Sequence, residues 1–567
     1  MKTIKEKSHL LARTSILFLF VFIFILPTVA QKKSSNNFEA SKNMEIFTTI
    51  IKELETNYVD EIKPGELIPI AIESMLEDLD PYTNYIPESQ IEDYQFMTTG
   101  QYGGIGALIH KNNDYVVVSE PYANFPANKA GLQAGDIILE INGKSAKGKT
   151  VNEVSETLKG QPGTVCEVLV ERYGVSKPVV KAVTREKITI DNVSYFGLLD
   201  GNIGFIRLTG FTQDASKEVA SALAKLKEKT TLKGLILDLR NNGGGLMNEA
   251  INIVNLFVDK GELVVSTKGK LDDKNKSYRT QFMPIDKEIP LVVLVNNNSA
   301  SASEIVSGAI QDLDRGVIVG QRTFGKGLVQ NVVPLAYNTQ MKVTVAKYYI
   351  PSGRCIQAID YSHKNGNGAF EKIPDSLINA FQTKNGRMVY DGGGIEPDVV
   401  LVPVTYSNIA YTLVNKFLIF DYATKFFSEH PGIPPAKDFE ITDAIFDDFV
   451  NFIFDKDYSY STKTEETLDK LKAVAEKEKY YEAIKEEFEA LKSKVSHNKK
   501  DELLTYKNEI QTLLKAEIAS RYYYQTGRTE ASLPTDTELA KATEIINDTT
   551  QYTSLLKISS PKPEISK

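Results

Sequence analysis

The stretch LVVLVNNNSASASEIVSGAIQ, residues 291–311, decides how the centre of this chain folds. Leu291 to Val295 is a continuous apolar run, which is typical of a strand buried on both faces. Glu304 to Gln311 follows with helical character, so the serine-rich segment between them is a strand-to-helix turn. A serine there lies at a helix N-terminus, where main-chain N–H groups and the helix dipole favour a developing anion. The same serines are also good helix caps, and the segment alone does not separate the two roles.

Strand and helix patterns alternate on both sides of this stretch. The order predicts an α/β core over residues 187–403 with a mixed, largely buried β-sheet. The predicted strands are Ile203 to Leu208 and Leu235 to Leu239, and the predicted helices are Ala215 to Lys229 and Leu246 to Val258.

The flanking regions have a different character. Residues 31–97 show apolar residues at helical spacing, whereas residues 98–186 combine short strand-like runs with glycine turns and one short helix. Residues 404–567 are charged and helical, and the polar tail after about Ser532 is predicted to be loosely ordered.

The bulk properties indicate an exported globular protein. The chain has 567 residues, 42% of them hydrophobic, and a formal net charge of −8, which argues against nucleic acid as a partner. Residues 1–30 combine a basic segment with an apolar run and predict a secretory signal, hence the periplasm or cell envelope. The alternative is an uncleaved segment that keeps the protein membrane-associated. Cys166 and Cys355 are predicted to be free thiols and suggest no metal site.

A nucleophilic serine needs a base, and none of the five histidines lies in a distinctive motif. The segment GQRTFGKG, residues 320–327, places Lys326 between two glycines. A lysine shielded from water loses proton affinity and can then act as a base near neutral pH. If the following segment is extended, Gln330 shares a face with Lys326. A phosphate-binding loop is the weaker interpretation, because Gly327 stands where Ser or Thr is required and a strand pattern follows.

A third segment, DLRNNGGG at residues 238–245, closes one predicted strand and leads into a helix. Three consecutive glycines expose main-chain N–H groups, which suits an oxyanion hole. A tight strand-to-helix turn is the alternative that the segment alone allows.

Together these segments resemble the C-terminal processing peptidases, also called tail-specific proteases, of peptidase family S41. The resemblance covers roughly residues 43–402 and includes further motifs. The matching pieces are residues 79–83 (LDPYT), 103–106 (GGIG), 130–136 (AGLQAGD), 238–242 (DLRNN), 299–304 (SASASE), 323–327 (TFGKG) and 394–398 (GIEPD).

The resemblance implies a serine endopeptidase with Ser301 as nucleophile and Lys326 as general base. Gln330 would support the lysine, and the N–H groups of Ala302 and Gly244 would form the oxyanion hole. Neither a metal nor a cofactor is implied.

Residues 98–186 resemble a PDZ domain inserted between the N-terminal helices and the core. This implies that protein or peptide substrates with apolar C-termini bind there, and Arg185 is a candidate sensor of the bound tail. The N- or C-terminal helices are candidates for homo-oligomer or adaptor contacts. The alternative function is a catalytically inactive PDZ scaffold. The implied tail-binding residues are Gly103, Gly104, Ile105 and Gly106 in the carboxylate loop and Val151, Val154 and Leu158 on the helix.

Overall fold

The computed structural model describes residues 27–495 and 499–557. The chain divides into two compact units, residues 1–85 and 86–567. The predicted secretory signal lies almost entirely outside the described residues. Within the described part of the chain, no helix has both the length and the apolar character needed to cross a bilayer.

The described part of the first unit contains two helices, α2 (Pro27–Asn57) and α3 (Pro64–Glu77). Both were predicted from the apolar spacing. Many of those apolar side chains are nevertheless exposed, including Ile46, Ile50 and Met75.

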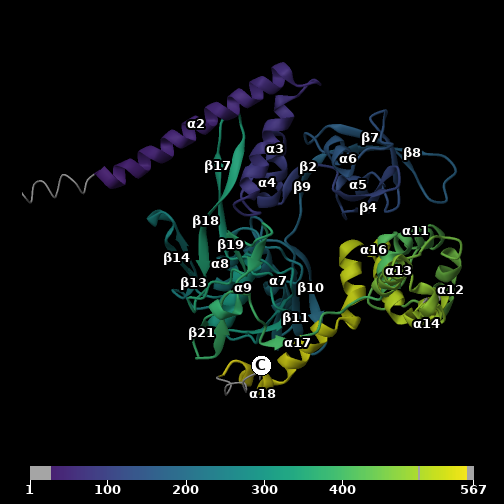
Figure 1. The fold of residues 1–567 in the computed structure, drawn as a ribbon. Coiled ribbons are helices and arrows are strands. Elements are labelled where there is room, and N and C mark those ends of the chain that lie inside the picture. The colour runs from purple at the N-terminus through teal and green to yellow at the C-terminus, as the bar shows by residue number, and fades with distance from the viewer. Residues whose placement is uncertain (1–26, 496–498, 558–567) are drawn as a thin grey trace, which may run out of the picture. The chain divides into compact units, whose positions relative to one another are not determined.

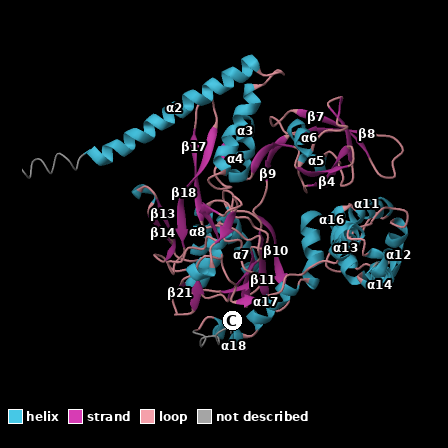
Figure 2. Ribbon diagram, in the orientation of Figure 1, coloured by secondary structure: helices cyan, strands magenta, loops and turns pink. Residues whose placement is uncertain are grey.

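The second unit begins with a short helix, α4 (Ile91–Thr99), and a module built mainly from antiparallel strands, seen in magenta in Figure 2. Its sheet has the order β3-β4-β5-β7-β8, and its short helix α6 carries Val154 and Leu158 into the module's core. Strands β2 and β9, where the chain enters and leaves the module, pair with each other. The bounds are β2 (Gln101–Gly104), β3 (Ala107–Asn112), β4 (Tyr115–Pro121), α5 (Pro126–Lys129), β5 (Ile137–Ile141), β6 (Lys144–Ser145), α6 (Val151–Leu158), β7 (Val165–Glu171), β8 (Val179–Thr184) and β9 (Glu186–Thr189).

The core is built on a six-stranded sheet of order β10-β11-β12-β15-β16-β23. Only β10 runs antiparallel to its neighbour, so the sheet is mixed, as predicted. Every residue of β12 and β15 is buried, which explains their uninterrupted apolar sequences. The strands are β10 (Val193–Leu199), β11 (Ile203–Leu208), β12 (Gly234–Asp238), β15 (Leu291–Val295), β16 (Val317–Gly320) and β23 (Val399–Val400).

Helices α7 (Ala215–Lys229), α8 (Met247–Asn255) and α9 (Ala302–Asp312) pack on one face of this sheet and form the largest apolar core. A second, antiparallel sheet adjoins these helices. In it β18 pairs with both β17 and β13, and β13 also pairs with β14. Its strands are β13 (Leu263–Gly269), β14 (Lys276–Arg279), β17 (Leu328–Pro334) and β18 (Gln340–Tyr349), and two short hairpins follow: β19 (Ile359–Lys364) with β20 (Phe370–Lys372), and β21 (Ala380–Gln382) with β22 (Met388–Tyr390).

Residues after β23 are largely helical, as predicted (Figure 1). Five of the helices, α10, α11, α12, α15 and α16, share an apolar core, and α13 and α14 pack against each other in a smaller one. Between α13 and α14, Lys479 adopts a left-handed conformation with φ of 56°. The helices are α10 (Asn408–Asn415), α11 (Leu418–Glu429), α12 (Asp443–Phe452), α13 (Lys463–Lys477), α14 (Tyr481–Val495), α15 (Lys499–Thr505) and α16 (Lys507–Ser532).

The prediction of a loosely ordered tail after Ser532 is wrong as far as residue 557. Helices α17 (Thr537–Asn547) and α18 (Thr549–Leu555), yellow in Figure 1, cover the second face of the central sheet. Leu539, Ala542 and Ile545 are buried against strand residues there. The sequence suggested disorder because the apolar residues are spaced among many polar ones, and the sheet face that buries them is distant in sequence.

Replacing Ile545 by Ala tests this packing. Ile545 is fully buried in the described structure, so we expect the free energy of unfolding to fall by about 2–4 kcal/mol in chemical denaturation. Glu544→Ala on the exposed side of the same helix is the control and should change it by less than about 0.5 kcal/mol. Equal stabilities for the two variants would contradict the packing.

Candidate active site

Three loops meet at one edge of the central sheet. Strands β12, β15 and β16 are parallel neighbours. Their carboxyl ends lead into the three segments that the sequence singled out: residues 238–245, 296–301 and 320–327. Ligand and catalytic sites of α/β sheets are commonly formed at this edge.

Ser301 lies at the turn between β15 and α9, where it is the N-cap residue of the helix. Its backbone has φ of 56° and ψ of −112°, a conformation that costs free energy for any residue with a side chain. Strain of this kind at a strand-to-helix turn is also seen where a nucleophilic serine is presented at the edge of a sheet. The flanking serines have structural roles, because the Ser299 and Ser303 hydroxyls are buried and donate to Leu239 O and Asn242 O.

Glu304, in the first turn of α9, joins the serine and lysine loops. Its Oε2 accepts hydrogen bonds from the main-chain N–H groups of Ser301 (2.8 Å) and Lys326 (2.9 Å). Its Oε1 accepts from the Thr323 hydroxyl (2.6 Å) and the Gly325 N–H (2.7 Å). Complete burial raises the pKa of Glu304 to about 7, although each of these four bonds favours the carboxylate and lowers it.

Tyr348 on β18 bridges the same two loops from the other side. Its hydroxyl oxygen lies 3.1 Å from Ser301 O and 2.5 Å from Lys326 O. The main chains of the two residues are therefore held together by two side chains, Tyr348 and Glu304. Sequence reasoning missed both roles. For Glu304 a signal existed, since an acid three residues after an N-cap residue reaches back to the N-cap main chain.

The glycine loop packs directly on Ser301. A Cβ atom on Gly244 would come within 2.8 Å of both the Ala302 nitrogen and Ser301 Cβ, and Gly244 has φ of +96°. Only glycine fits at this position without displacing the nucleophile loop. The Gly244 N–H donates to Asn242 Oδ1 at 2.9 Å, so this structure does not present it to an incoming oxyanion.

Gln330 lies on β17, four residues after Lys326, and its amide nitrogen donates to the Thr344 hydroxyl at 3.2 Å. The β17–β18 register shifts between Val329 and Gln330. The structure thus fixes Gln330 against the neighbouring strand, on the segment that continues directly from the lysine loop.

The residues predicted to bind a substrate tail lie around the open edge of the β3 sheet. β3 is the terminal strand of its sheet and faces α6, and the loop containing Ile105 and Gly106 precedes it. Val154 and Leu158 point into the core and only Val151 is partly exposed, so the helix offers less groove surface than its sequence suggested. Gly103 and Gly104 already belong to β2, which is paired with β9.

Arg185, the candidate sensor, is buried inside the PDZ-like module. Its guanidinium donates to the carbonyl oxygens of Leu158 (2.9 Å) and Thr157 (2.8 Å) and to the Thr164 hydroxyl (3.1 Å). These bonds satisfy carbonyls at the C-terminal end of α6, which is the usual place for a cation at a helix terminus. In this structure Arg185 therefore anchors the C-terminal end of α6.

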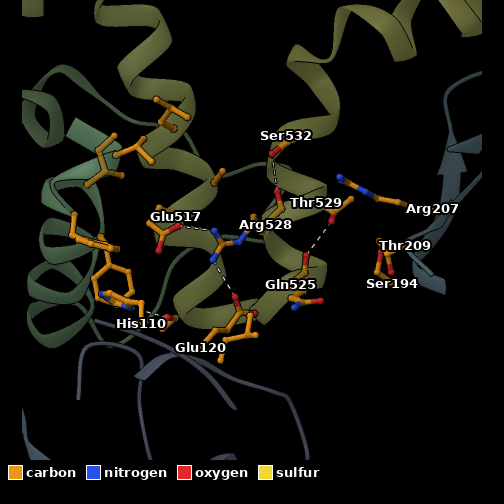
Figure 3. A pocket seen from close by; sticks show the side chains of 18 residues that line it. His110, Glu120, Ser194, Arg207, Thr209, Glu517, Gln525, Arg528, Thr529 and Ser532 are labelled. Atoms are coloured by element: carbon orange, nitrogen blue, oxygen red, sulfur yellow. Dashed lines mark hydrogen bonds and ion pairs between the residues drawn. The ribbon is translucent and has the colours of Figure 1, made fainter. Parts of the chain in front are cut away.

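A cavity of about 730 Å³ separates the outer face of β3 and β4 from α11 and α16 (Figure 3). Arg528 of α16 crosses it, with ion pairs to Glu120 (3.0 Å) and Glu517 (2.7 Å). His110 stacks on Phe417 at a centroid distance of 4.2 Å. Burial raises the pKa of Glu120 and lowers that of His110. This outer face is thus closed by the helical domain.

Glu304 should make folding stability depend on pH. Between its ordinary pKa of 4.5 and the folded value of about 7, the folded protein holds a proton that the unfolded chain releases. The free energy of unfolding should therefore fall as pH rises from about 4.5 to 7, by on the order of 3 kcal/mol. Denaturation of the protein and of Glu304→Gln at several pH values measures the effect. An identical slope in the two proteins would contradict the assignment.

Comparisons with known proteins agree with this architecture. Family models match residues 202–362 (Peptidase family S41), 117–172 (PDZ domain) and 409–546 (Probable PDZ-protease, C-terminal helical domain). The last match includes α10 to α16 and most of α17, beyond the region where the sequence showed a resemblance.

Relatives with similar sequences cover much of the chain. A carboxy-terminal-processing protease of Bartonella bacilliformis is 38% identical over 338 residues, which are 59% of this chain and 77% of the relative. A probable CtpA-like serine protease of Staphylococcus aureus is 30% identical over 459 residues, 81% of this chain and 89% of the relative. A solved structure of a photosystem II D1 C-terminal processing protease is 31% identical, covers 62% of this chain and 86% of that one, and has a TM-score of 0.35. This chain belongs to peptidase family S41 and is a serine-type C-terminal processing protease with a PDZ domain.

Proposed function

We propose that the protein cleaves peptide bonds with a Ser301–Lys326 dyad. The observation that carries the proposal is that the main-chain N–H groups of both residues donate to one oxygen of Glu304. This arrangement brings a lysine loop to a serine at a helix N-terminus. A nucleophile and a base on adjoining loops are what acyl transfer requires.

The reaction proceeds in two halves. The neutral Lys326 amine takes the hydroxyl proton of Ser301 as the serine oxygen bonds to the substrate carbonyl carbon. The tetrahedral intermediate collapses, the peptide C–N bond breaks, and the lysine gives its proton to the leaving amine. Water then attacks the acyl-enzyme, with Lys326 again as base, and releases the acid product and free Ser301. Gln330 orients the lysine segment.

The oxyanion is stabilised by the Ala302 N–H at the start of α9, where the helix dipole adds to the hydrogen bond. The Gly244 N–H serves as the second donor after it exchanges Asn242 Oδ1 for the substrate oxygen. Gly244 lies close enough to Ser301 for this role.

Ser301→Ala should lower kcat by about 10⁴-fold or more, because the nucleophile is lost while the fold is kept. Lys326→Ala should lower it by at least about 10³-fold and remove one ionisation from the rate–pH profile. Cleavage of an unfolded protein, followed by mass spectrometry, measures both.

The exposed Lys372→Ala on β20 is the matched control and should cleave normally. Full proteolysis by Ser301→Ala would refute the dyad. If the unmodified protein binds tails and cuts nothing, it is the inactive scaffold that the sequence left open.

We further propose that substrates are exported proteins held by their C-terminal tails. An extended tail would add to the open edge of β3, with its carboxylate on the N–H groups of the loop around Ile105 and Gly106. Burial of apolar side chains against Val151 would favour apolar tail residues. The predicted signal at residues 1–30 supports substrates of the periplasm or cell envelope.

Tail binding should depend on the free carboxylate. Fluorescence anisotropy with Ser301→Ala protein should show that a peptide ending in apolar residues binds at least about tenfold more tightly than the same peptide with a C-terminal amide, because the charged hydrogen bonds are lost. Val151→Asp should weaken the carboxylate peptide to a similar extent. Equal affinity for acid and amide would exclude tail recognition by this loop.

A further inference from the structure

The guanidinium of Arg240 is surrounded by three carboxylates, two of them supplied by the C-terminal region. Nε and Nη2 donate to Asp238 at 2.9 and 2.8 Å. Nη1 and Nη2 donate to Asp536 at 3.0 and 2.7 Å, and Nη1 donates to Glu538 at 2.7 Å. All five N–H donors of the arginine are therefore used. Burial lowers the pKa of Arg240, and the neighbouring Asp238 and Asp536 outweigh it, so the guanidinium stays charged.

The main chain after Arg240 leads directly to the nucleophile. Asn242 lies two residues further on, and its carbonyl oxygen accepts from the Ala300 N–H (3.1 Å) and the Ser303 hydroxyl (2.8 Å). These two residues flank Ser301. If the Arg240 side chain moved, the loop of residues 238–245 would move with it. This loop contacts Ala300 and Ser303 through Asn242 and contacts Ser301 through Gly244.

Glu538 reaches the other loop as well. While its Oε2 binds Arg240, its Oε1 accepts a hydrogen bond from the side chain of Gln321. Gln321 directly follows β16 and begins the loop that ends at Lys326. One carboxylate from the C-terminal region therefore contacts both the glycine loop that packs on Ser301 and the loop that ends at Lys326.

The two acids are held in place by a rigid element. Asp536 caps α17, accepting from the N–H groups of Glu538 (3.1 Å) and Leu539 (2.9 Å). α17 lies on the sheet that carries the loops, and the Tyr552 hydroxyl of α18 accepts from Leu291 N–H at 2.9 Å. Supporting side chains on packed helices can hold a site to within the tolerance that catalysis needs.

We propose that Asp536 and Glu538 are positioning residues of the peptidase, which act through Arg240 and Gln321 to hold the glycine loop, which packs on Ser301, in register with the loop that ends at Lys326. The inference rests on the proposed dyad and extends it to a region with no catalytic residue. The C-terminal helices thereby complete the active site.

The double variant Asp536→Asn, Glu538→Gln tests the proposal. Its side chains keep their size and lose both charges, so the loops should move while the substrate sites stay intact. We expect kcat on a fluorogenic peptide to fall at least about tenfold, since displacements near 1 Å can cost 10²-fold, with KM within about twofold. If the double variant folds poorly, Glu538→Gln and Glu538→Asp are compared, and the charge-retaining Asp should recover part of the lost kcat.

Two controls separate positioning from stability. Ile545→Ala removes apolar packing beneath α17 and lowers stability but leaves the contacts of Asp536 and Glu538 with Arg240 in the folded protein, so at a temperature well below its Tm it should keep the kcat of the unmodified protein. Glu544→Gln removes an exposed charge from the same helix and should have no effect. In an Arg240→Gln, Gln321→Ala background, adding the double change should alter kcat less than about threefold, because both residues through which the acids act would then be gone.

The proposal is overturned if the folded double variant has a kcat within twofold of the unmodified protein. It is also overturned if Ile545→Ala loses kcat to the same extent, or if Glu538→Asp is no better than Glu538→Gln. Ser301→Ala in the same assay separates a failure of the dyad from a failure of the positioning role. Activity in that variant would refute the dyad. An inactive Ser301→Ala together with a fully active double variant would refute only the positioning role.

Discussion

The structure of the catalytic edge depends on one buried carboxylate. The loops bearing Ser301 and Lys326 follow different strands, and four donors from the two loops converge on Glu304. A buried carboxylate is costly unless its lone pairs are satisfied, and here both loops must be in place to satisfy them. The hydrogen bonds that stabilise buried Glu304 therefore also hold the Ser301 loop against the Lys326 loop.

A second cluster of charged side chains, around Arg240, supports the same edge of the sheet. Arg240 leads into the glycine loop, and its donors are divided between a strand-end acid, Asp238, and two acids of the C-terminal region. A buried guanidinium in this setting is fixed in orientation as well as in charge, because each planar N–H has one partner. Helices distant in sequence thus belong to the peptidase core and cover the sheet face that would otherwise be exposed.

The same stretch of chain also contacts the PDZ domain. Helix α16 is kinked at Tyr524, whose hydroxyl accepts from Asn128 at 2.8 Å, and Arg528 pairs with Glu120 one turn later. α16 then leads through a short turn into α17. These contacts lie on the outer face of β3 and β4. One continuous segment, from α16 to α17, therefore contacts both the PDZ domain and the peptidase core.

Local sequence determined the elements and the chemistry. The apolar runs at Leu235 and Leu291 gave buried parallel strands, and strand-to-helix turns placed Ser301 and the glycine loop at one edge, because periodicity and turn chemistry are local properties. Only the tertiary structure decided which side chains meet across those turns: Glu304 with the lysine loop, and Asp536 with Arg240. These pairings, like the packing of α17, depend on burial between residues far apart in the chain, which no local pattern encodes.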